Sequence, residues 1–215
     1  MLRHSWDVTP KEAFRVQEEL AKYLKLYFSG GAIKTVGGVD CSYKDGVASA
    51  TVVIMRFPDF EIIENISVKK PISFPYVPTL LTFREGPPVM ECFGKMRTKP
   101  DCMLYDGQGT AHPRRMGLAA HLGVLTGIPS VGCAKSLLVG ENKEPGTGRG
   151  SYRDIRDKSG HVVCTALRTR ANVKPVYVSP GHLMDMKTAV KLVLDCSLRY
   201  RLPEPLRLAH KLAAL

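Results

Sequence analysis

The chain has 215 residues, 44% of them hydrophobic, which is enough for a domain with a substantial core and excludes an intrinsically disordered protein. No run approaches the ~20 apolar residues of a membrane helix, and the N-terminus lacks the apolar core of a secretory signal. Lysine and arginine number 31 against 20 aspartate and glutamate residues, and the net charge of +11 favours a polyanionic partner such as nucleic acid.

The cysteines, 6 in all, are scattered and form no Cys-x-x-Cys pair, which argues against a zinc ribbon. Several stand inside apolar runs, as small buried residues of a reducing compartment do. We therefore expect a cytoplasmic protein that has no contact with a membrane, and we expect it to be a monomer.

The N-terminal part predicts one helix followed by an antiparallel meander. Thr9, Pro10 and Glu12 combine a capping hydroxyl, a proline suited to the first helical position and a capping-box glutamate, so a helix begins here. Strand character starts near residue 35, and Asp45-Gly46 between two apolar runs is a strong hairpin signal. A second strand extends to residue 57 and a third covers about 61–68, which gives three consecutive strands with short turns.

The rest of the chain alternates helices with short strands. We expect a helical region over 79–97 with a break at Gly86-Pro87-Pro88, a strand from Cys102 and a helix from Pro113 to about 126. The remaining expected segments are a strand at 130–133, a mobile loop at 142–150, strands at 161–169 and 176–178, a helix over 183–198 and a last helical turn or two within 206–215. An antiparallel half leading into α/β units predicts an α/β fold with a mixed sheet flanked by helices, in one domain spanning 1–215.

The segment after the Cys102 strand predicts a ligand site. Asp106 ends the apolar run, two glycines follow within three residues, and His112 precedes two arginines. Open α/β sheets place ligands at the carboxyl ends of their strands, so an acid, an imidazole and two guanidinium groups here indicate a site for a metal and a phosphate. The alternative is that Asp106 shapes a turn and the arginines are solvated, and this segment alone leaves both interpretations open.

Asp40 is a second candidate because it stands inside a predicted strand, where aspartate is disfavoured. By alternation, Asp40 and Ser42 point to one face of the sheet, and Val39 and Cys41 point to the other. A buried carboxylate costs several kcal/mol unless a cation or donors satisfy it. A divalent metal shared with Asp106 would do so, and Mg²⁺ prefers such oxygen ligands. A strand-end aspartate paired with lysine or arginine is the alternative.

Six motifs occur in a fixed order along most of the chain: VGGVDCS (36–42), FPYVP (74–78), FREGP (83–87), DGQGTAHPR (106–114), GCAKS (132–136) and SPGH (179–182). In this set the chain closely resembles the endonuclease V family, repair nucleases that recognise deaminated purines, and the tail from Arg201 to His210 resembles it too. The resemblance implies a ribonuclease-H-like fold. It also implies hydrolysis of the second phosphodiester bond 3′ to hypoxanthine, dependent on Mg²⁺ with Mn²⁺ as a substitute, leaving 3′-hydroxyl and 5′-phosphate ends.

The resemblance also assigns the catalytic residues. Asp40, Glu85 and Asp106 would bind the metal, Lys135 would contact phosphate, and His210 would lie at the edge of the acidic site. Read without the family motifs, Glu85 and Lys135 are more typical of solvated side chains, and His210 of an ordinary surface histidine.

The segment Pro75-Tyr76-Val77-Pro78 would be a stiff wedge that separates the strands, with Tyr76 at its tip. A pocket for the extruded base would include Leu81, Gly107 and His112, with backbone groups reading the purine edge. Read alone, this segment is more typical of a rigid loop with a packed tyrosine. Thr79 stands where many relatives carry glycine, so the approach of the backbone to the base and the strictness of selection could differ in this chain.

The expected partner is DNA containing deoxyinosine, and inosine-containing RNA is the alternative within the same family. The sequence does not indicate which residue, if any, recognises the 2′-hydroxyl group that distinguishes the two. A nucleic-acid-binding module without catalysis is disfavoured, because a pure binder gains nothing from acids that face phosphate. A sugar-kinase-like ATPase is disfavoured because 215 residues are too few for its two related domains.

Overall fold

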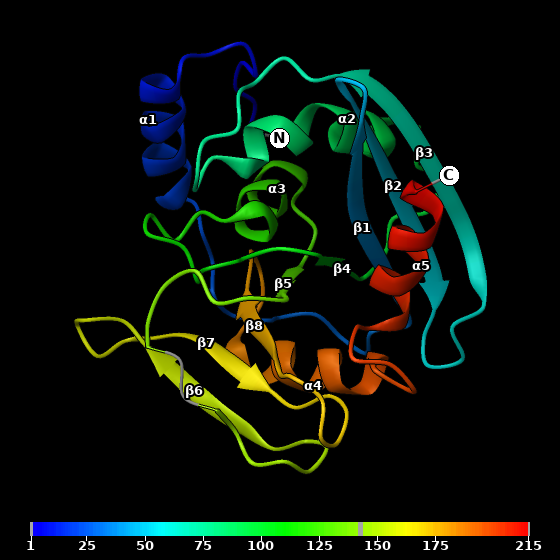
Figure 1. Ribbon diagram of the computed structural model, residues 1–215. Coiled ribbons are helices and arrows are strands. Elements are labelled where there is room, and N and C mark those ends of the chain that lie inside the picture. The colour runs from blue at the N-terminus through cyan, green and yellow to red at the C-terminus, as the bar shows by residue number, and fades with distance from the viewer. Residues whose placement is uncertain (1, 142–143, 215) are drawn as a thin grey trace.

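The computed structural model describes residues 2–141 and 144–214. Within them, eight strands form one sheet in the order β3-β2-β1-β4-β5-β8-β7-β6, with helices on both faces (Figure 1). In chain order the elements are α1 (Pro10–Ala21), β1 (Thr35–Lys44), β2 (Val47–Arg56), β3 (Ile62–Pro71), α2 (Leu81–Lys95), β4 (Cys102–Tyr105), α3 (Leu118–Thr126), β5 (Ser130–Ala134), β6 (Tyr152–Arg156), β7 (Val162–Leu167), β8 (Val176–Pro180), α4 (Met186–Cys196) and α5 (Glu204–Ala213).

The predicted meander is confirmed: β1 pairs with β2, and β2 with β3, both antiparallel. The β1–β2 turn uses left-handed backbone at Asp45 and Gly46, as the hairpin signal predicts. The two short strands β4 and β5 then run parallel to β1, while β8 is antiparallel to β5. This mixed sheet with its flanking helices is the predicted ribonuclease-H-like α/β fold.

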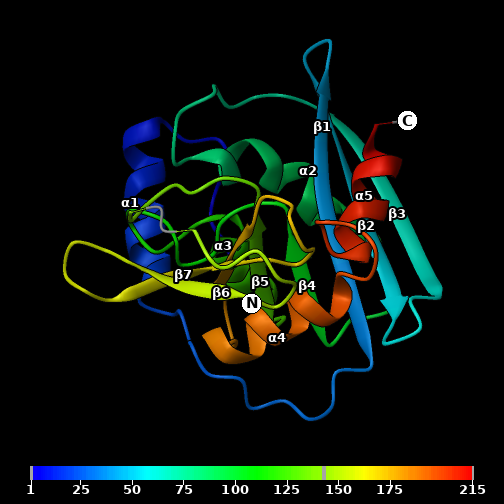
Figure 2. The ribbon, with the colours of Figure 1, turned by 60° about the horizontal axis from the view of Figure 1, so that its bottom comes forward.

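Alternation along β1 divides the core between the two faces of the sheet. Val39 packs with α2 and α3 in one apolar cluster, whereas Val36 packs with α4 and α5 in another. Figure 2 shows β1 between α2 on one side and α5 on the other. No helix of the described residues is long and apolar enough to cross a membrane.

The predicted break at Gly86-Pro87-Pro88 is wrong, because α2 is continuous through it. Each proline lacks an N–H, so the carbonyls of Phe83 and Arg84 lose their helical donors, at a cost of about 3 kcal/mol or more per interior proline. Phe83 and Val89 are fully buried, and burying such side chains contributes about 1.5–3 kcal/mol each. Tertiary burial therefore holds the helix together where local sequence favours a break.

Two predicted helix starts are also wrong. The helix predicted from Pro113 begins at Leu118, because Arg115 has a left-handed φ of 54° and Gly117 is the N-cap. The helix predicted from residue 183 begins at Met186, after Asp185 caps it by accepting the backbone N–H of Thr188. Strand β6 was not predicted, and residues 142–143 of the predicted mobile loop lie outside the described residues.

Candidate active site

Helix α5 lies directly on β1 because Gly38 has no side chain. A Cβ at Gly38 would be 2.3 Å from the backbone of Pro205. Further along the strand, the hydroxyl of Ser42 donates to the carbonyl of Ala213 at the other end of α5. The helix therefore runs along the face of β1 that carries residues 38, 40 and 42. This alignment brings His210 to Asp40, with 2.9 Å between Nδ1 and Oδ2.

Asp40 and Asp106 are neighbours because of strand register. The parallel pairing of β1 with β4 ends at Val39 opposite Tyr105; Asp40 is the next residue of β1, and Asp106 is the residue that follows β4. The backbone N–H of Asp106 continues the ladder by donating to the carbonyl of Val39 at 3.3 Å. Burial raises the pKa of Asp40, the hydrogen bond with His210 opposes this, and the negative charge of Asp106 adds to the increase.

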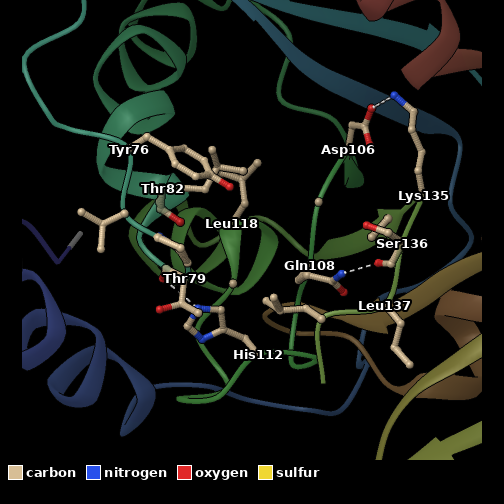
Figure 3. Close-up of a pocket in the computed structure, with 17 residues that line it drawn as sticks. Tyr76, Thr79, Thr82, Asp106, Gln108, His112, Leu118, Lys135, Ser136 and Leu137 are labelled. Atoms are coloured by element: carbon tan, nitrogen blue, oxygen red, sulfur yellow. Dashed lines mark hydrogen bonds and ion pairs between the residues drawn. The ribbon is translucent and has the colours of Figure 1, made fainter. Parts of the chain in front are cut away.

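Lys135 follows β5, the strand next to β4, and its Nζ lies 2.5 Å from Oδ2 of Asp106. Figure 3 shows this ion pair at one side of a cavity. Both side chains are partly accessible, 43% for Lys135 and 15% for Asp106, so the pair faces the cavity and its mouth. The ammonium group is thus placed to meet an anionic ligand that approaches Asp106.

Glu85 reaches the same area from α2, on the opposite face of the sheet from α5. It is only 7% exposed, and its Oε1 accepts a 2.7 Å hydrogen bond from the hydroxyl of Tyr43, near the end of β1. Burial raises the pKa of Glu85 to about 8; the Tyr43 hydrogen bond opposes this, and the charges of Asp40 and Asp106 add to it. Three carboxyl groups from three elements, Asp40, Glu85 and Asp106, therefore influence one another; we call them the acidic site.

The acidic site fits a divalent cation by its donor chemistry. Carboxylate oxygens are the ligands that Mg²⁺ and Mn²⁺ prefer. The raised pKa values of Asp40 and Glu85 show that burial and the neighbouring carboxylates disfavour their charged forms, and a bound cation would offset this. The side chains are not gathered into a preformed site, since no group of three or more His, Cys, Asp and Glu residues in 2–141 and 144–214 is arranged to hold a metal. Instead, Asp106 is paired with Lys135 and Asp40 with His210.

A cavity of about 380 Å³ adjoins the acidic site, and Asp106 and Lys135 form part of its wall. Six residues predicted to bind substrate also line it: Tyr76, Val77, Pro78, Leu81, Gly107 and His112. Pro75 is outside the cavity wall. Figure 3 shows Tyr76 and Thr82 on one side and Lys135 and Ser136 on the other. Tertiary structure thus joins the segments after β3, β4 and β5 around one space.

His112 lies in this cavity as a neutral ring with both nitrogens engaged. Its Nδ1 accepts the backbone N–H of Arg114 at 3.2 Å, so its Nε2 carries the proton and donates to the carbonyl of Thr79 at 2.8 Å. Burial lowers the pKa of His112 to about 4. The imidazole therefore offers a ligand the surface of its ring rather than a free nitrogen.

Several residues of the site were missed by sequence reasoning. Tyr43, which holds Glu85, carries no signal in sequence beyond its nearness to Asp40. Gln108 and Ser136 stand inside two of the motifs, and the amide of Gln108 joins the two cavity-wall segments by donating to the carbonyl of Ser136 at 2.9 Å. Leu118, the first residue of α3, also lines the cavity.

The comparisons with known proteins agree on one family. The model of the endonuclease V family matches residues 18–211. An endonuclease V from Roseiflexus sp. (strain RS-1) is 46% identical over 97% of this chain and 94% of its own. The crystal structure of endonuclease V from Streptomyces avermitilis has a TM-score of 0.92 and 38% identity, covering 99% of this chain and 95% of its own.

A Ciona intestinalis endonuclease V, crystallised with a 24mer DNA that contains an inosine followed by a ribo-adenosine, has a TM-score of 0.85 and 31% identity. That match covers 95% of each chain. The matches run from α1 through the segments that carry the acidic site and the cavity to α5. With sequence, fold and the order of all six motifs in agreement, this chain belongs to the endonuclease V family of nucleases.

Proposed function

We propose that the protein is a DNA repair endonuclease that recognises hypoxanthine and related deaminated purines. It hydrolyses the second phosphodiester bond 3′ to the lesion and leaves 3′-hydroxyl and 5′-phosphate ends. The observation that carries this proposal is the cavity that Asp106 and Lys135 share with Tyr76, Leu81 and His112. A base held in that cavity leaves the following backbone next to the acidic site. The inosine-containing DNA in the Ciona relative supports the substrate class.

On the chemical side, Asp40, Glu85 and Asp106 hold Mg²⁺, for which Mn²⁺ can substitute. When bound, the cation lowers the pKa of a water molecule and stabilises charge on the phosphate. The Nδ1–H of His210 donates to the carboxylate of Asp40 and so orients that group. Lys135 holds a phosphate oxygen next to Asp106 as a point charge, and Tyr43 keeps the Glu85 carboxyl group in place.

On the base side, the segment 75–78 carries Tyr76, whose side chain is largely free of packing because the residue is 72% exposed. Prolines on both sides stiffen this segment, so the ring can replace a stacked base without a large loss of chain entropy. Leu81, Gly107 and His112 enclose the extruded base. Because both nitrogens of His112 are engaged, backbone groups of the cavity read the purine edge.

The second candidate is an inosine-specific endoribonuclease that uses the same residues. It is favoured by the nucleotide in the Ciona complex, where a ribo-adenosine follows the inosine. A residue that recognises the 2′-hydroxyl group would have to lie near the acidic site, where the nucleotide on the 3′ side of inosine would be bound. We further propose that the chain acts as one domain, as a monomer and in the cytoplasm.

The test uses 5′-labelled DNA and RNA oligonucleotides of identical sequence that carry inosine or adenosine at one position. With Mg²⁺, we expect one cut in the inosine-containing DNA at the second bond 3′ to inosine, with a 3′ end that a polymerase can extend. Faster cutting of RNA would favour the endoribonuclease. Binding of both inosine strands without any cut, in Mg²⁺ or Mn²⁺, would contradict an enzymatic role.

A further inference from the structure

Thr79 has a backbone conformation that its side chain disfavours. Its φ is +72°, in the left-handed region, where a β-branched residue is a genuine outlier. The residue lines the cavity between the wedge segment 75–78 and the first turn of α2. A conformation of this kind persists only where surrounding contacts impose it, and such residues cluster at ligand sites.

The contacts that impose it converge on the Thr79 carbonyl and hydroxyl. The carbonyl oxygen accepts from Nε2 of His112 at 2.8 Å and from Nε2 of Gln17 at 3.1 Å. The guanidinium of Arg114 donates to the hydroxyl at 2.6 Å and contacts the same carbonyl oxygen at 3.4 Å. Figure 3 shows the bond between Thr79 and His112.

Gln17 and Arg114 also bind each other and so act as one unit. Nε of Arg114 donates to Oε1 of Gln17 at 2.7 Å, and the guanidinium stacks over the ring of Phe14, 4.3 Å from its centroid. Gln17 is fully buried, and its amide donates to the carbonyl of Met116 as well. Helix α1, far from the acidic site in sequence, is thereby connected to the wall of the cavity.

We propose that Arg114 and Gln17 are positioning residues for base selection. They hold Thr79 in its left-handed conformation, and Thr79 sets how the wedge segment and the start of α2 face each other across the cavity. Neither residue belongs to the acidic site, so their effect falls on which base is accepted and not on the hydrolytic step. This inference rests on the proposed recognition of deaminated purines.

The first test replaces Arg114 and measures selectivity. Arg114→Ala should reduce the preference for inosine over adenosine in matched duplexes about tenfold, the equivalent of one hydrogen bond to a charged group. The change should appear in KM and in the Kd measured by fluorescence anisotropy in EDTA, with kcat on single-stranded inosine DNA within about threefold of the original. Arg115→Ala is the matched control: contrary to the predicted phosphate site, this neighbouring side chain is exposed, lies outside the cavity wall and makes no hydrogen bond or ion pair in the described residues.

The second test restores the conformation without the contacts. Glycine adopts a left-handed φ without strain, so Thr79→Gly should make the protein tolerant of Arg114→Ala. The double variant should recover most of the lost selectivity. If Arg114→Ala does not fold, Arg114→Lys takes its place in the test. Lysine keeps the charge but cannot reach Gln17 and Thr79 together, so this variant should show the same loss of selectivity.

Loss of selectivity that is equally large in the double variant would overturn the proposal, as would a fall in kcat with unchanged KM and Kd. An equal loss in Arg115→Ala would show that only local charge matters and would overturn it too. If the unaltered protein shows no preference for inosine, the proposed function itself fails, and the variants are not needed to detect that.

Discussion

The acidic site and the cavity share a wall, yet they are built in different ways. Asp40 lies within β1 and Asp106 directly follows β4, each one residue beyond the last pair of the β1–β4 ladder, where backbone hydrogen bonds determine their separation. The cavity is lined largely by connecting segments. In its wall, side-chain hydrogen bonds from Gln17, His112 and Arg114 hold the conformation of Thr79. A ladder of backbone bonds tolerates little adjustment, whereas loops held by a few side chains can be altered by single substitutions.

This contrast indicates which substitutions the protein can accept without losing activity. Hydrolysis needs its carboxyl groups at constant positions, which a sheet supplies. Base selection depends on loop positions that a distant helix can influence, as α1 does through Gln17. We therefore expect substitutions at the acidic site to remove activity outright, and substitutions around the cavity to change which substrates are used.

Substitutions of the two aspartates beside the β1–β4 ladder should have the strongest effect. Asp40→Ala and Asp106→Ala should each reduce inosine cleavage by about a thousandfold or more, because each removes a proposed ligand of the cation. Binding to inosine-containing DNA should survive in part, since contacts to phosphate supply much of the affinity. Single-turnover cleavage and anisotropy would measure the two quantities. Near-normal turnover in either variant would contradict the assignment of that residue to the metal.

A second effect concerns stability and pH. Because the pKa of Glu85 is about 8 in the folded protein against an ordinary 4.5, the folded state holds the proton more tightly than the unfolded state. Its contribution is fully present below pH about 4.5 and is lost as pH rises through 8. Glu85→Gln should remove this loss. Without divalent cations, the free energy of unfolding of the variant, compared with that of the unaltered protein, should therefore rise by on the order of a few kcal/mol between pH 5 and 8.

The comparison with Glu85→Gln is needed because buried histidines act in the opposite direction. Burial lowers the pKa of His112 and His121, which stabilises the fold as pH rises toward the ordinary histidine value. Urea unfolding of both proteins at several pH values, in EDTA, gives the difference directly. A constant difference between pH 5 and 8 would show that Glu85 is not held protonated.

A third effect tests the cavity side. Tyr76→Ala should slow cleavage of inosine in duplex DNA more than in single strands, because an aromatic contact with a base is worth about 1–3 kcal/mol only where unstacking must be offset. The rate ratio of the two substrates measures this. Tyr152→Ala, at another largely exposed tyrosine, on the edge strand β6, is the control. Equal losses on both substrates would assign Tyr76 to general binding.

The smallest effect is expected where the sheet supports α5. Gly38→Ala places a methyl group against the backbone of Pro205 and should cost about 1–3 kcal/mol of stability. It should also lengthen the contact between His210 and Asp40 and reduce the cleavage rate without changing base preference. Gly31→Ala, where a Cβ has open space, is the matched control. A Gly38 variant with altered base preference would break the separation between the two regions.

Much of the fold was predictable because local signals and the tertiary structure agree. The capping box at Thr9, the Asp45-Gly46 turn and the three-strand meander all formed as predicted. The prolines of α2 are the clearest failure, since their local preference is outweighed by burial of the helix against the sheet. Helix starts at Leu118 and Met186 were misplaced because single residues with left-handed backbone, Arg115 and Leu183, delay them.

For the site, the sequence supplies the candidate residues: Asp40, Glu85, Asp106 and Lys135 stand in the motifs, and His210 stands in the C-terminal tail that resembles the family. Their assembly was decided by tertiary structure, because strand register places Asp40 beside Asp106 and the absence of a side chain at Gly38 lets α5 bring His210 across. The roles of Tyr43, Gln17 and Arg114 also come from contacts between segments far apart in the chain. Local sequence encodes backbone preferences and chemistry, but a hydrogen bond between distant side chains exists only once the sheet and its helices have packed.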